Sequence, residues 1–130
     1  MELEASGHDA DAAAMPALAA ALAQLEETVG DREFVAELIG DFLDGLPAQL
    51  AALREASSNG DEEHLHRVAH TLKSNAATFG AAGLAEACRE LEQAARGAEP
   101  PETRELVARV EAEAARAEPA LAAARDERSS

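Results

Sequence analysis

Three of the four histidines in this 130-residue chain, His64, His66 and His70, fall close together, and the only lysine, Lys73, follows them. A neutral imidazole nitrogen is a nucleophile that can accept a phosphoryl group. An ammonium group one helical turn away would stabilise the negative charge that this group brings. Because the other ten basic residues are all arginine, the position of the lysine indicates phosphoryl chemistry at His70.

The histidines lie on a predicted helix that begins after the capping residue Asp61. At about 100° per residue, His70 falls about 150° from the centre of the apolar stripe of this helix, so we expect it to face solvent. Ser74 and Ala77 share its face and are small, which leaves room for another surface to approach. The stripe consists of Leu65, Val68, Ala69, Leu72, Ala76 and Phe79.

Apolar residues at three- and four-residue steps predict further helices elsewhere in the chain. They cover about residues 15–29, 32–56, 84–95 and 102–125. The second continues through Pro47, because its apolar stripe stays in phase on both sides, and we expect one kinked helix there. Short connections favour antiparallel neighbours. The predicted fold is therefore all-α: an antiparallel up-down-up-down four-helix bundle with a short accessory N-terminal helix.

The predicted bundle occupies residues 15–125. Residues 1–14 have no periodic large apolar positions and are expected to form a disordered lead-in. Residues 126–130 are expected to form a disordered tail. Four long helices in one chain can complete a bundle alone, so a monomer is expected.

Composition restricts the class of protein. The chain holds 34 alanines and carries a net charge of −15, so phosphate backbones and anionic lipids would repel it. Its apolar stretches are shorter than the roughly 18–20 residues that a membrane span needs. The acidic start Met1–Glu4 does not resemble a secretory signal, and the single Cys88 fits a reducing compartment. We expect a cytoplasmic protein that binds neither nucleic acid nor membranes.

The segment from His70 to Gly80 resembles the signature of the histidine-containing phosphotransfer (HPt) domains. That signature is His-x-x-Lys-Gly, with a further Gly ten residues after the His. Lys73 and the helix-end glycine Gly80 match it, whereas Ser74 replaces the first Gly. A serine still leaves room for a partner, and its hydroxyl could donate a hydrogen bond to a phosphoryl oxygen. The resemblance extends more weakly over about residues 30–97.

This resemblance implies a phosphocarrier in a two-component multistep phosphorelay. His70 would carry a phosphoryl group between aspartates of receiver domains, and Lys73 and Ser74 would stabilise it. The implied partners are response-regulator receiver domains and a hybrid histidine kinase. The receiver would supply carboxylates and Mg²⁺, so the chain would need no cofactor or metal of its own and would not be an enzyme. The candidate docking residues are His66, Arg67 and Ala77.

Three alternatives compete with this interpretation. A degenerate bundle that is not phosphorylated could act as an adaptor and bind a partner through the same face. His66 and His70, with Glu62 one turn earlier, could form part of a metal site, although no second element with ligands is evident. Hydrolysis through a nucleophile is disfavoured, because Cys88 falls on the inner stripe of its helix and Ser74 lacks a base and an orienting group.

Overall fold

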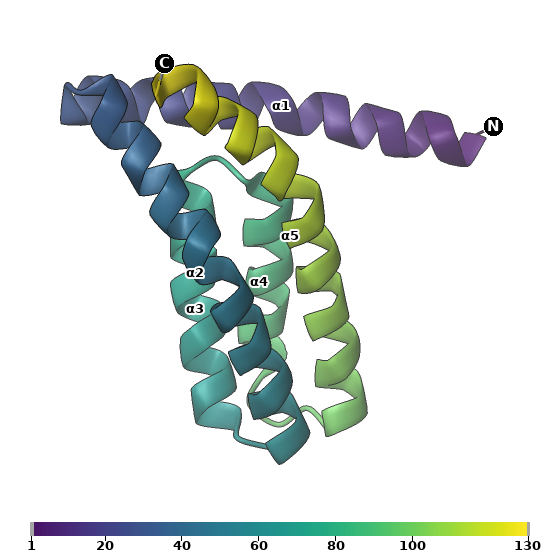
Figure 1. The fold of residues 1–130 in the computed structure, drawn as a ribbon. Helices are drawn as coiled ribbons and strands as arrows, with labels where there is room; N and C mark the ends of the chain where they lie inside the picture. The colour runs from purple at the N-terminus through teal and green to yellow at the C-terminus, as the bar shows by residue number, and fades with distance from the viewer. Residues whose placement is uncertain (1, 130) are drawn as a thin grey trace.

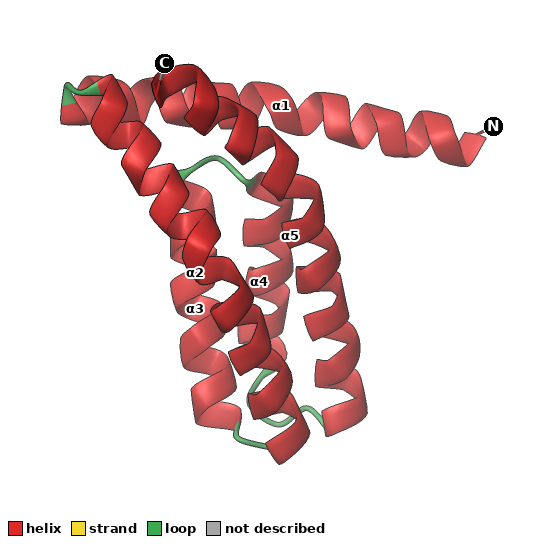
Figure 2. Cartoon of the chain, in the orientation of Figure 1, coloured by secondary structure: helices red, strands yellow, loops and turns green. Residues whose placement is uncertain are grey.

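A computed structural model shows the chain as a set of helices joined by short connections (Figure 1). The structure describes the backbone of residues 2–129 and the side chains of residues 16–129. Within these residues there is no strand (Figure 2), so the all-α prediction is confirmed. The helices are α1 (Glu2–Val29), α2 (Arg32–Asn59), α3 (Glu62–Thr78), α4 (Ala82–Ala94) and α5 (Pro100–Ser129).

Helices α2 to α5 pack side by side, with α2 against α5 and α3 against α4 as the most extensive pairs. The α2–α3 and α4–α5 connections lie at one end of this bundle, and the α3–α4 connection lies at the other (Figure 2). Helix α1 crosses the end that holds the α3–α4 connection and extends past it (Figure 1). No helix in the described part of the chain is both long and apolar enough to span a membrane.

Local sequence signals explain where α2 and α3 begin. The carboxylate of Asp31 accepts a hydrogen bond from the backbone N–H of Phe34 at 3.1 Å. Asp61 accepts one from the N–H of His64 at 3.2 Å, so the predicted cap of the histidine-bearing helix is confirmed. Helix α2 runs without a break through Pro47, as predicted, since Leu46 beside it is fully buried in the core.

Two ends of the chain are more helical than the sequence predicts. Helix α1 is 28 residues long rather than short, and it includes residues 2–14, where we expect a disordered lead-in. A periodic apolar stripe marks only those helices that pack against a core. An alanine-rich segment can be helical through its intrinsic propensity and carry no such stripe. Helix α5 likewise continues to Ser129, where Nε of Arg128 lies 3.3 Å from a carboxylate oxygen of Glu26. Met1 and Ser130 lie outside the described residues.

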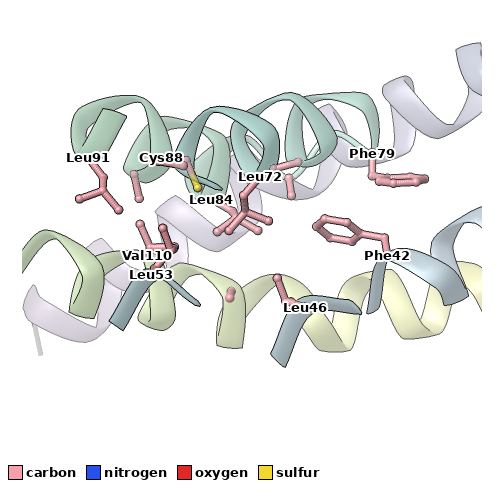
Figure 3. Packing of buried hydrophobic residues seen from close by; sticks show 14 of the residues in the cluster. Phe42, Leu46, Leu53, Leu72, Phe79, Leu84, Cys88, Leu91 and Val110 are labelled. Carbon is pink, nitrogen blue, oxygen red and sulfur yellow. The ribbon is translucent and has the colours of Figure 1, made fainter. Parts of the chain in front are cut away.

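The core lies between α2, α3, α4 and α5 (Figure 3). Leu22 of α1 also belongs to it. The rings of Phe42 and Phe79 pack with their centroids 5.2 Å apart. Cys88 is fully buried, as the sequence predicts, and this burial raises the pKa of its thiol to about 12. Because the thiolate is the reactive form of cysteine, Cys88 is a packing residue and not a nucleophile.

Gly80, in the turn after α3, is the point where α1 meets the bundle. Its φ of +75° is a conformation that other residues rarely adopt. A Cβ atom at this position would lie 2.6 Å from Cα of Leu18 and 2.7 Å from Cβ of Ala21. Helix α1 therefore packs directly on the backbone of the α3–α4 turn, and only a glycine allows this approach.

Replacing Gly80 with alanine should destabilise the protein through both the backbone conformation and the clash with α1. The matched control is Gly30→Ala, since Gly30 has the same φ of +75° but nothing within 4 Å of the added Cβ. We expect Gly80→Ala to lower the free energy of unfolding in urea by about 1–3 kcal/mol more than Gly30→Ala. Equal losses in the two variants would show that the contact with α1 contributes nothing.

Candidate functional site

His70 stands on the outer face of α3, opposite the buried residues of that helix. Leu65, Ala69, Leu72 and Ala76 are buried, whereas the side chain of His70 is 57% exposed. The helical wheel predicts this orientation. A histidine with this exposure is available to another molecule rather than satisfied within the core.

A carboxylate from the neighbouring helix α4 holds the imidazole of His70. Oε2 of Glu92 lies 2.6 Å from Nδ1 of His70, which is hydrogen-bonding distance. The side chain of Glu92 is only 13% exposed and is therefore more buried than the imidazole that it contacts. This contact ties the reactive face of α3 to α4.

The second oxygen of the same carboxylate binds the lysine that the sequence singles out. Nζ of Lys73 lies 2.5 Å from Oε1 of Glu92, and the lysine side chain is 30% exposed. His70 and Lys73 are one turn apart on α3, as predicted, and Glu92 bridges them. The lysine is therefore paired in this structure and is not a free cation.

The charge state of Glu92 determines which nitrogen of His70 carries a proton. The hydrogen bond from Lys73 lowers the pKa of Glu92, and the His70 contact acts in the same direction, whereas partial burial opposes both. Glu92 is therefore ionised near neutral pH, and an ionised carboxylate can only accept hydrogen bonds. Nδ1 of His70 must then be the donor, which leaves the lone pair of a neutral imidazole on Nε2.

His66 lies beside the same carboxylate. Its Nε2 is 3.6 Å from Oε2 of Glu92, and its side chain is 30% exposed. The imidazole rings of His66 and His70 are nearly parallel, at 5°, with centroids 6.4 Å apart. The sequence analysis proposes His66 as a docking residue, and the structure places it against α4 as a neighbour of Glu92.

The other predicted site residues surround this centre. Ser74 and Ala77 are exposed on α3, and Gly80 forms the turn under α1. Arg67 is exposed and faces the other way, towards α2. There it borders a shallow groove between α2 and α3, lined by Ala48, Gln49, Ala52, His64, Arg67, Val68 and Thr71. The structure thus groups His66, His70 and Lys73 around Glu92 and leaves Arg67 on an adjacent face.

The sequence analysis does not predict a role for Glu92. A helical hairpin that turns at Gly80 would bring together residues at similar distances on either side of that glycine. His70 lies ten residues before Gly80 and Glu92 lies twelve after it, so this spacing is the signal in the sequence that could identify the pair. In a chain with 26 acidic residues, one more glutamate on a helix does not stand out. Its importance depends on the register of α3 against α4, which a helical wheel of either helix alone does not contain.

The metal alternative involves Glu62, but the carboxylate that reaches His66 and His70 is Glu92. Among the described residues, no group of three or more His, Cys, Asp or Glu side chains is arranged to hold a metal ion. One oxygen of Glu92 is also occupied by Lys73.

Comparison with known protein families identifies the family of the domain. The family model of the Hpt domain matches residues 37–120, which include His70, Lys73 and Glu92. Comparisons with curated proteins and with solved structures give no match. Hpt domains act in phosphorelays as histidine phosphocarriers rather than enzymes, and they interact with receiver domains and kinases. The chain belongs to the Hpt domain family.

Proposed function

We propose that this protein carries a phosphoryl group on Nε2 of His70 between receiver-domain aspartates in a two-component multistep phosphorelay. The observation that carries this proposal is the exposed imidazole whose Nδ1 contacts the ionised carboxylate of Glu92 at 2.6 Å. This contact favours the tautomer whose lone pair is on Nε2, the ring nitrogen that Glu92 does not bind. Membership of the Hpt family supports the same activity at the level of the family.

The transfer step follows from this arrangement. The lone pair on Nε2 of His70 attacks the phosphorus of an aspartyl phosphate, and an N–P bond forms. The P–O bond to the aspartate breaks, and its electron pair leaves on the aspartate carboxylate. The imidazole gains positive charge during this step, and Glu92 stabilises that charge through the proton on Nδ1.

The phosphoryl group brings negative charge to the outer face of α3. Lys73 has a flexible stem and three donors, so it can turn towards a phosphoryl oxygen one helical turn away. Ser74 is exposed on the same helix, and its hydroxyl can donate a further hydrogen bond. These two residues are the proposed phosphate-stabilising pair.

The other groups that phosphoryl transfer needs are proposed to come from the partner. In this proposal the receiver supplies the carboxylates and Mg²⁺, and the bundle supplies the nucleophile, the compensating charge and a docking face. The partners are response-regulator receiver domains and a hybrid histidine kinase. The protein is proposed to work as a cytoplasmic monomer without a cofactor of its own.

Docking is proposed on the exposed face of α3 and the adjoining α2. The loop positions in Figure 2 support an antiparallel up-down-up-down bundle, in which α2 and α3 are neighbours. The groove between them is lined by small or uncharged residues except for His64 and Arg67. Arg67 and Ala77 are exposed at this surface or beside it, and His66 borders His70 on the α4 side. An adaptor that binds through this face without phosphorylation is the alternative.

The phosphocarrier and the adaptor differ in covalent labelling. A receiver domain that carries a ³²P-labelled aspartyl phosphate should pass the label to this protein in an acid-labile, alkali-stable form. His70→Gln should accept none, whereas His8→Gln, which alters a histidine of α1 outside the proposed docking surface, should still be labelled. Absence of label on the unaltered protein across the receiver domains of the same organism would favour the adaptor.

Lys73→Ala should slow transfer onto His70 by about tenfold or more, since a charge-assisted hydrogen bond contributes about 1.5–3 kcal/mol. The bundle should stay folded, because the lysine lies outside the core. Rapid-quench kinetics give the rate, and circular dichroism gives the helix content. Lys73→Arg, which keeps the charge, should retain more of the rate. Unchanged kinetics in Lys73→Ala would make Lys73 a surface charge without a role in transfer.

A further inference from the structure

One carboxylate in this site is surrounded by three nitrogen-bearing side chains. Glu92 binds Lys73 through Oε1 and His70 through Oε2, and Nε2 of His66 lies 3.6 Å from Oε2. The first two distances are those of hydrogen bonds, but the third is too long for one. In this state Lys73 is the counter-ion of Glu92, and His66 is a close neighbour that does not yet bind it.

We propose that phosphorylation of His70 exchanges the counter-ion of Glu92: Lys73 turns to the phosphoryl group, and His66 takes up a proton and replaces it. This inference rests on the proposed function, since it requires a phosphoryl group on His70. It assigns His66 a role as a positioning residue, which acts on the reaction through Glu92. The proton comes from solvent, and no other group is consumed.

The first half of the exchange follows from charge. A phosphoryl group on His70 carries nearly two negative charges, whereas the Glu92 carboxylate carries one. Lys73 lies one turn from His70 and has a long flexible stem, so the dianion attracts it more strongly than the carboxylate does. Glu92 is only 13% exposed and would then be left partly buried without a cation.

The second half follows from the position of His66. Its Nε2 needs to move by less than an ångström to donate a hydrogen bond to Oε2 of Glu92. Protonation makes both ring nitrogens donors and turns this close approach into an ion pair. The nearly parallel packing of the His66 and His70 rings also places any phosphoryl charge on His70 close to His66.

Among the charged groups around His66, the carboxylates favour this proton uptake and the arginines oppose it. On α4 it faces Glu92, and Arg89 lies one turn before that residue, whereas Arg96 lies in the turn that follows α4. Arg89 is already paired with Glu86.

On α3 itself, Glu62 and His70 lie one turn before and after His66. The α2 side of α3 presents His64 and Arg67, which line the groove on that side. Helix α1 contacts the turn at Gly80, at the far end of α3 from His66.

The exchange links phosphorylation to pH. If the phosphorylated protein binds one more proton than the unphosphorylated protein, a fall in pH favours the phosphorylated form. The ring centroids of His66 and His70 are 6.4 Å apart. Two negative charges acting over a distance of about this size in a water-like dielectric shift a protonation equilibrium about tenfold. The carrier would therefore retain its phosphoryl group more strongly as the surroundings become more acidic.

Imidazole ¹⁵N NMR tests the exchange directly, because the ring nitrogen shifts report the protonation state of each histidine. The uniformly labelled full chain is recorded before and after phosphorylation of His70 by phosphoramidate, over about pH 6 to 8. We expect the protonation equilibrium constant of His66 to rise about tenfold on phosphorylation. His64, on the same helix but facing α2, is the internal control and should change much less.

Glu92→Gln provides the second arm, since an amide keeps an acceptor for His70 but offers no charge to His66. In this variant the rise at His66 should be smaller than in the unaltered protein, because only the direct effect of the phosphoryl charge remains. Phosphorylation of His70 without a selective change at His66 would overturn the exchange while leaving the proposed function intact. Failure of phosphoramidate and of every receiver to modify His70 would overturn both.

Discussion

Both oxygens of the Glu92 carboxylate receive donors from α3, and the chemical character of His70 depends on this interaction. Lys73 on Oε1 lowers the pKa of the carboxylate, and the ionised carboxylate in turn favours the proton of His70 on Nδ1. The lone pair of the neutral ring is then on Nε2, which is the nucleophile in the proposed function. A histidine on an isolated helix would have no such preference, so the reactive group belongs to the α3–α4 pair and not to α3 alone.

The rest of the fold keeps these two helices in register. Leu72 of α3 and the α4 residues Leu84, Cys88 and Leu91 are fully or almost fully buried in the shared core. The turn at Gly80 connects the helices, and α1 packs on its backbone. A slip of α3 against α4 by one helical turn would shift their contacts by about 5.4 Å and separate His70 from Glu92. Core packing therefore determines the geometry of an exposed site.

The helices, the exposure of His70 and the neighbouring lysine could be predicted from the sequence, because each depends on the 3.6-residue period of one helix. The structure adds the side-chain contacts between different helices. Glu92 was missed because its partner is on another helix, and His66 was interpreted only as a docking residue for the same reason. The length of α1 was missed because alanine-rich helix without an apolar stripe leaves no periodic signal.

The central claim, that Glu92 fixes the tautomer of His70, can be measured on the unphosphorylated protein. Long-range ¹H–¹⁵N NMR at a pH where His70 is neutral distinguishes the protonated ring nitrogen from the unprotonated one. The structure requires the proton of His70 on Nδ1 in the unaltered protein and a loss of that preference in Glu92→Ala. A proton on Nε2 in the unaltered protein, or an identical tautomer in the two proteins, would contradict this account of the site.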